Sequence, residues 1–104
     1  MPRPLGLAAL RILAAISRGS AYGLDIVATT GLPSGTVYPT LGRLRKSGHV
    51  KARWEDQRQA DREGRPRRRY YELSGEGEKA LAEGSARVAR AAEALELGVR
   101  KATS

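Results

Sequence analysis

The sequence has no cysteine and one histidine, His49, among its 104 residues. Disulfide bonds, thiolate zinc sites and cysteine nucleophiles are therefore excluded by composition. His49 has no metal-ligating residue at a suitable spacing, so we expect no metal site. Glycine-rich phosphate loops and paired carboxylates in an apolar setting are also absent from the sequence. We therefore expect a protein that is not an enzyme and uses no cofactor.

Long apolar runs and aromatic side chains are also scarce. Arg11 and Arg18 interrupt the apolar stretch near the N-terminus, which makes it too short and too charged for a signal-peptide core or a membrane span. We therefore expect a single small domain in the cytoplasm, without a membrane partner. Because the chain has one Trp, four Tyr and no Phe, aliphatic side chains must build the core.

Acidic residues are outnumbered throughout the first part of the chain. Asp and Glu total 11 against 19 Lys and Arg, which gives a formal net charge of +8. Residues 1–48 hold six basic residues and one acidic residue, residues 49–73 hold eight and five, and residues 74–104 hold five of each. A basic body with a neutral C-terminal segment favours a polyanionic partner, and nucleic acid is the first expectation.

Apolar residues recur at three- and four-residue spacing in three segments, each ended by a glycine. This pattern predicts amphipathic helices over about 4–18, 21–30 and 34–47. We expect Ser20 to cap the second helix and Ser34 to cap the third. Pro39 falls near the start of the third helix, where the lost hydrogen bond is easiest to absorb, and we expect a bend there.

Apolar and polar residues alternate in two later segments, which is typical of β-strands. The segments cover about 50–55 and 68–73. Trp54 falls on the apolar face of the first strand, so we expect it in the core. The polar residues between the strands, 56–66, predict a long and mobile hairpin loop.

The last segment, residues 74–104, predicts a helix that Ser74 caps and that has an apolar seven-residue repeat. A lone helix would expose this repeat to water, so we expect it to form a homodimer contact. The residues expected in that contact are Leu81, Val88, Ala91, Leu95 and Val99.

Three short helices followed by a hairpin form a winged helix-turn-helix, so the expected fold class is mainly α with a small β-hairpin. We expect residues 1–73 to form the winged helix-turn-helix DNA-binding domain, and residues 74–104 to form the C-terminal dimerisation helix packed on the same domain. In this architecture the third helix enters the major groove of double-stranded DNA, and the hairpin loop reaches the backbone or the minor groove.

Two blocks of the sequence resemble PadR-type bacterial transcriptional regulators. GLPSGTVYPTL at 31–41 resembles the recognition helix of that family, and GRP at 64–66 followed by RRYYELS at 68–74 resembles its wing and the entry to its final helix. The resemblance covers about residues 5–81. It implies a dimeric transcription factor, usually a repressor, that binds an inverted-repeat operator. Some members bind aromatic ligands with aromatic residues of the last helix, but residues 74–104 contain none, so a small-molecule effector has no support in the sequence.

The candidate DNA contacts lie in the third helix and in the predicted wing. Polar residues of the third helix project away from its apolar stripe, although any exposed polar residue does so. The wing arginines repel one another unless a polyanion neutralises them, although charged loops are often only solvated. We expect Arg65 to project ahead of the hairpin. The expected DNA-binding residues are Ser34, Gly35, Thr36, Tyr38, Pro39, Arg43, Arg65, Arg67 and Arg68.

Two functions are consistent with this pattern. The leading interpretation is a sequence-specific DNA-binding repressor that acts as a homodimer. The alternative is a non-specific basic nucleic-acid-binding or chromosome-packing protein, which needs the charge but not the ordered motif in the third helix. The ratio of specific to non-specific affinity at one salt concentration separates the two.

Overall fold

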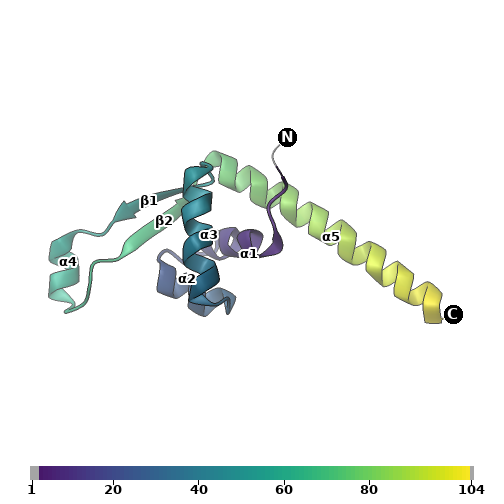
Figure 1. Ribbon diagram of the computed structural model, residues 1–104, viewed down its shortest axis with the longest axis horizontal. Helices are drawn as coiled ribbons and strands as arrows, with labels where there is room; N and C mark the ends of the chain where they lie inside the picture. The colour runs from purple at the N-terminus through teal and green to yellow at the C-terminus, as the bar shows by residue number, and fades with distance from the viewer. Residues whose placement is uncertain (1–2, 104) are drawn as a thin grey trace.

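The computed structural model describes residues 3–103. Its elements in chain order are α1 (Leu7–Ser17), α2 (Gly23–Thr30), α3 (Ser34–Lys46), β1 (Val50–Trp54), α4 (Gln57–Arg62), β2 (Arg69–Leu73) and α5 (Gly75–Thr103). The expected fold class, mainly helical with one two-stranded hairpin, is confirmed. Figure 1 shows the hairpin and α5 leaving the helical body in opposite directions, so the molecule is elongated, at 63 × 30 × 21 Å. No helix among the described residues is long and apolar enough to cross a membrane.

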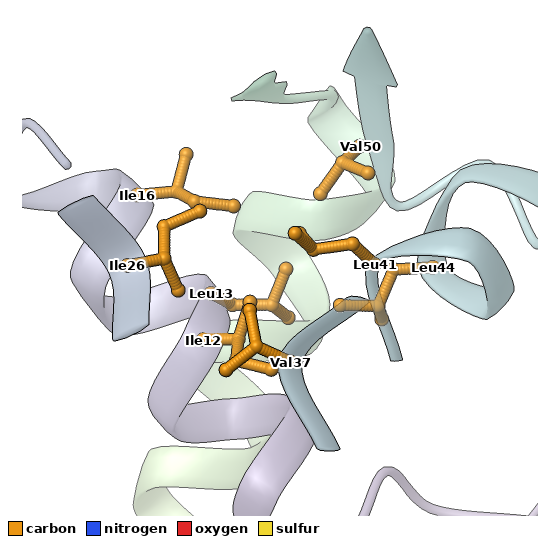
Figure 2. Packing of buried hydrophobic residues seen from close by; sticks show 8 residues of the cluster. All are labelled: Ile12, Leu13, Ile16, Ile26, Val37, Leu41, Leu44 and Val50. Carbon is orange, nitrogen blue, oxygen red and sulfur yellow. The ribbon is translucent and has the colours of Figure 1, made fainter. Parts of the chain in front are cut away.

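The core lies where α1, α2 and α3 meet the base of the hairpin (Figure 2). It is wholly aliphatic, as the lack of Phe predicts, and each such side chain stabilises the fold by about 1.5–3 kcal/mol when fully buried. The cluster consists of Ile12, Leu13, Ile16, Ile26, Val37, Leu41, Leu44 and Val50.

The expected serine caps of α2 and α3 are wrong. Tyr22 is the N-cap of α2, while Ser20 is buried and its hydroxyl shares a 2.9 Å hydrogen bond with Thr29. Pro33 is the N-cap of α3, because its extended backbone (ψ 146°) precedes the first helical turn and leaves Ser34 already inside the helix. Pro39 lies within α3, as expected.

The hairpin is antiparallel, with Val50 opposite Leu73 and Trp54 opposite Arg69. The N–H of Glu55 donates to the carbonyl of Arg68 at 2.8 Å, which extends the pairing beyond the strands. On the other side of β2, the N–H of Tyr71 donates to the carbonyl of Ala21 at 2.7 Å. The segment before α2 therefore pairs with β2 and fixes the hairpin to the helical body.

The position predicted for Trp54 is wrong. Val50, on the same face of β1, is 3% exposed, whereas Trp54 is 53% exposed. The alternation of β1 is as predicted, but the strand extends past the edge of the helical body. The face that is buried at Val50 is therefore open to solvent at Trp54.

The segment expected to be a mobile loop contains a helix, α4. Asp56 caps it by accepting a hydrogen bond from the backbone N–H of Arg58 at 2.8 Å, and side chains four residues apart bond along its surface. Ala60, in its middle, is buried. These local interactions order a segment whose polarity alone indicates a loop.

The hairpin of β1 and β2, with α4 between the strands, forms the wing, and Glu55 anchors it although this residue is charged. Its side chain is 5% exposed, and both carboxylate oxygens accept hydrogen bonds from Arg65, at 2.7 and 2.8 Å. The hydroxyl of Tyr70 donates to it at 2.9 Å, and the backbone N–H of Arg68 donates at 3.2 Å. We call the Glu55–Arg65 pair the wing latch. Because Arg65 turns inward to form it, the expectation that Arg65 projects ahead of the hairpin is wrong.

The wing latch also changes the ionisation of both partners. The Arg65 hydrogen bonds, followed by those from Arg68 and Tyr70, lower the pKa of Glu55 from 4.5 to about 2, despite an opposing effect of desolvation. Glu55 in turn raises the pKa of Arg65. Each partner therefore stabilises the charged form of the other.

The start of α5 packs closely on the rest of the chain. Ser74 caps the helix as predicted, since its Oγ accepts a hydrogen bond from the N–H of Gly77 at 3.0 Å. A Cβ atom placed on Gly77 would lie 2.0 Å from the carbonyl oxygen of His49, and one on Gly84 would lie 2.3 Å from Cδ2 of Leu10. Glycine at these positions lets α5 approach the helical body.

We predict that Gly77→Ala destabilises the protein by about 1–3 kcal/mol, because the added methyl group overlaps a backbone atom that has no rotamer to escape into. Gly42→Ala is the matched control: Gly42 lies inside α3 with open space around it, so the change should stabilise by about 0.5–1 kcal/mol. Chemical denaturation of both variants measures the difference. Equal stabilities would contradict the close approach of α5.

We also predict that Glu55→Gln lowers the melting temperature at neutral pH. The folded-state pKa of Glu55, about 2, lies below its unfolded value, so the stabilisation is complete above about pH 4.5 and is lost as the pH falls towards 2. Melting curves between pH 7 and 2 should therefore show the difference between wild type and variant shrinking only in that acid range. Glu72→Gln, at an exposed carboxylate of β2, should show no such convergence. A difference that is constant with pH would contradict the latch.

Candidate nucleic-acid interface

Helix α3 presents the residues that the sequence singles out on its solvent side. Val37, Leu41 and Leu44 are buried in the core, so the opposite face of the helix is open. That face carries exposed Ser34, Gly35, Tyr38, Pro39 and Arg43, together with half-buried Thr36. The guanidinium of Arg43 donates to the hydroxyl of Thr40 at 3.0 Å, which holds it along the helix.

Tyr38 joins α3 to the start of α2. A Cβ atom on Gly23 would lie 2.4 Å from Cε1 of Tyr38 and 2.7 Å from its hydroxyl oxygen. The ring therefore packs against the bare backbone of Gly23, while 45% of the residue remains exposed. Tyr38 therefore supports the packing of the two helices while part of its side chain remains open to solvent.

The remaining wing arginines lie over aromatic rings. The guanidinium carbons of Arg67 and Arg69 are 4.8 and 5.4 Å from the ring centre of Trp54. The guanidinium of Arg68 is 4.0 Å from the ring centre of Tyr22. All three distances fall within the range of cation–π attraction.

A groove of about 360 Å³ lies between the start of α2, the side of α3 and the wing. We call it the wing groove. Of the described residues that line it, none is acidic. Its charged and aromatic lining consists of Tyr22, Tyr38, Trp54, Tyr71, Arg65, Arg67, Arg68 and Arg69. The groove thus brings α3 and the wing, which are far apart in the sequence, to one basic and partly aromatic surface.

Sequence reasoning missed Trp54 and Tyr22 as parts of this surface. The useful signal is the register of the hairpin, which places Trp54 opposite Arg69 and next to the arginine cluster. The contact of Arg68 with Tyr22 depends on the pairing of residues 21–22 with β2, which has no signature in the sequence.

Helix α5 carries one apolar stripe along its length. Its first part, including Leu81, packs against the core of the same chain. Further along, Ala91 is exposed, and Val88, Leu95 and Val99 are 40%, 72% and 63% exposed. Leu81 therefore serves the chain's own core, which the prediction of a dimer contact did not include.

Among residues 3–103, which the structure describes, no three His, Asp or Glu side chains gather into a set that could hold a metal ion. The ring of His49 instead shares a 2.6 Å hydrogen bond through Nδ1 with the hydroxyl of Ser47.

Solved structures share this fold. A PadR family transcription regulator from Clostridium difficile R20291 is 20% identical, with a TM-score of 0.79 over 90% of this chain and 99% of that one. The protein smu.1704 from Streptococcus mutans UA159 is 29% identical, with a TM-score of 0.78 over 96% and 94%. BpsR of Bordetella bronchiseptica, whose DNA binding is regulated by 6-hydroxynicotinic acid, is 19% identical, with a TM-score of 0.66 over 100% and 84%. No curated protein matches the sequence.

A family model confirms the resemblance found in the sequence. The transcriptional regulator PadR-like family matches residues 12–83, a segment that runs from α1 through the wing into the first turns of α5. Members of this family regulate transcription and are not enzymes. Because the match covers well over half of its length, the chain belongs to the PadR-like family of transcriptional regulators.

Proposed function

We propose that this protein is a sequence-specific repressor that binds an inverted-repeat operator as a homodimer. The observation that carries the proposal is the wing groove, where the solvent side of α3 and the arginines of the wing meet without an acidic residue in the lining. A helix for the major groove beside a basic wing is the arrangement that winged helix-turn-helix proteins use on DNA.

The proposed base and backbone contacts from α3 are the exposed residues of its first half together with Arg43. In helix-turn-helix readers, the N-terminal residues of the recognition helix face the base edges. Arg43 is the residue best suited to guanine, because a guanidinium can donate to O6 and N7 together. The full set comprises Ser34, Gly35, Thr36, Tyr38, Pro39 and Arg43.

The proposed phosphate contacts of the wing are Arg67 and Arg68. Arg65, which the sequence also indicates, has its guanidinium engaged by two carboxylates, those of Glu55 and Glu63. Its proposed contribution to DNA binding is therefore indirect, through the shape of the wing.

The proposed dimer contact is the outer part of the α5 stripe: Val88, Ala91, Leu95 and Val99. The same side of α5 that packs on the core near Leu81 continues beyond the body as exposed apolar surface. A second copy of α5 would cover that surface. The two winged helix-turn-helix domains, related by a two-fold axis, would then each bind one half of a palindromic operator.

Repression is the proposed outcome because a dimer on promoter DNA blocks polymerase by occupancy alone. A small-molecule effector is not part of the proposal, since α5 carries no aromatic residue with which to stack one.

The function is tested by selecting duplexes from a randomised library and comparing them with scrambled duplexes at one salt concentration. We predict that the selected duplex binds at least about 10³-fold more tightly. Arg43→Ala should lose about ten- to 150-fold of that affinity and relax the preference at one position. Lys46→Ala is the matched control, because it removes a charge from the exposed end of the same helix. Equal affinity for selected and scrambled duplexes would favour the non-specific packing protein.

The dimer is tested by sedimentation equilibrium at micromolar concentration, where we predict a mass of about twice 11.2 kDa. Leu95→Asp should give a monomer, because the charge falls in the apolar stripe. Ala86→Asp is the control: it adds the same charge at an exposed position two and a half turns away, on the opposite side of α5. A wild-type monomer that binds a palindrome tightly would contradict the proposal.

A further inference from the structure

The arginines of the wing fall into two groups. The guanidinium of Arg65 donates hydrogen bonds to the carboxylates of Glu55 and Glu63. By contrast, the guanidinium groups of Arg67, Arg68 and Arg69 donate no hydrogen bond to any residue in the range 3–103 that the structure describes. Within that range the Nε of Arg69 is even buried without a partner.

Aromatic rings hold this second group. Arg67 and Arg69 lie over Trp54, and Arg68 lies over Tyr22. A ring fixes a guanidinium through its face and leaves the N–H donors at the edge unoccupied. An ion pair with a carboxylate, such as that of Arg65, consumes those donors instead.

The aromatic residues of the chain are concentrated here. Four of its five aromatic residues, Tyr22, Tyr38, Trp54 and Tyr71, line the wing groove. The fifth, Tyr70, packs edge-on against Tyr22, with ring centres 6.0 Å apart. Trp54 is more than half exposed although a tryptophan is costly to leave in water. Of these residues only half-buried Tyr71 packs against the core, whose buried cluster contains no aromatic side chain, so the clustering of the others requires a reason beyond core packing.

The geometry of a DNA duplex supplies an occupant. If α3 enters the major groove and the wing reaches the adjacent minor groove, the sugar–phosphate strand that separates the two grooves must pass between α3 and the wing. That path crosses the wing groove, whose arginines complement the charge of the strand. Its exposed aromatic surface complements the apolar edges of deoxyribose.

We infer that Trp54 and Tyr22 are positioning residues, whose rings hold the guanidinium groups of Arg67 and Arg68 towards the phosphates of the sugar–phosphate strand in the wing groove. The inference rests on the proposed function and adds the atoms of DNA that the groove receives. A small aromatic anion is the other occupant of suitable chemistry. It is disfavoured because the guanidinium groups of Arg67 and Arg68 lie over two of the rings, Trp54 and Tyr22, on which it would stack.

The test compares Trp54→Leu with Trp54→Phe, which change the ring but none of the charges. Dye-labelled duplexes, both selected and scrambled, are titrated at several salt concentrations. We expect Trp54→Leu to weaken binding of both duplexes about five- to thirtyfold, since two cation–π contacts are lost. Trp54→Phe should stay within about threefold of wild type. The ratio between the two duplexes should not change, because backbone contacts are independent of sequence.

The salt dependence separates positioning from a general loss of structure. Arg67→Ala should reduce the magnitude of the slope of log K against log salt by about 0.9, and Trp54→Leu by up to the same amount, because Arg67 is the phosphate ligand that Trp54 holds. Adding Arg67→Ala to Trp54→Leu should then cost less than it does in wild type, since the two changes act on one contact. Additive effects with an unchanged slope in Trp54→Leu would overturn the inference.

Wild-type protein provides a second measurement, which does not depend on whether a variant folds. Trp54 is the only tryptophan in the chain, so its fluorescence reports on the groove alone. We expect its emission to change in step with duplex binding. Duplex binding that leaves the emission unchanged would refute the inference. Benzoate serves as the small aromatic anion. The inference would also be refuted if benzoate changed the emission and displaced DNA, while DNA alone left the emission unchanged. If the wild-type protein binds selected and scrambled duplexes equally well, the proposed sequence-specific function fails. The change in Trp54 emission still decides, independently, whether the groove contacts the DNA backbone.

Discussion

The carboxylate of Glu55 is the interaction on which the wing depends. It is one acidic group, almost fully buried, and it receives hydrogen bonds from Arg65, from Tyr70 and from the backbone of Arg68. Glu55 precedes α4 and all three partners follow it, so a single side chain joins the two ends of the segment that contains α4. The path of the chain from Pro66 to Arg69, and with it the direction of the other arginines, follows from that closure.

The same region shows two ways to place many like charges in a small space. The wing latch neutralises one arginine with a carboxylate, at the expense of its hydrogen-bond donors. Trp54 and Tyr22 instead attract guanidinium groups with the electrons of their rings and leave the positive charge uncompensated. The net positive charge expected from composition is therefore kept on the surface while its arrangement is ordered. A wing built from lysines would lack this order, because an ammonium group stacks less readily on a ring.

Much of the fold was predictable from the spacing of apolar residues and from the glycines that end the helices. The helices α1, α2 and α3, both strands and the cap at Ser74 follow from apolar spacing, glycines and alternation, which report on local geometry. Besides the N-caps of α2 and α3, three features were not. Trp54 obeys the alternation of its strand, but how far the strand extends past the body depends on tertiary packing. Helix α4 is too short for a periodic signal, and its stability comes from one cap and a few side-chain pairs. Arg65 faces inward because Glu55, ten residues away, is within its reach in the folded hairpin.

In the candidate site, the exposed residues of α3 were predictable from the helical stripe, whereas the aromatic supports of the arginines depend on contacts across strands.

The junction at Ser74 sets the mechanics of the molecule. This single residue separates β2 from α5, and its hydroxyl both donates to the carbonyl of Gly48 at 2.5 Å and accepts from Gly77, while its N–H donates to the carbonyl of His49 at 3.1 Å. Strand and helix therefore meet in a stiff joint rather than a hinge. In the proposed dimer, a stiff joint at Ser74 would turn a tilt of α5 into a rotation of the hairpin base, so the orientation of α5 would set the spacing of the two wings.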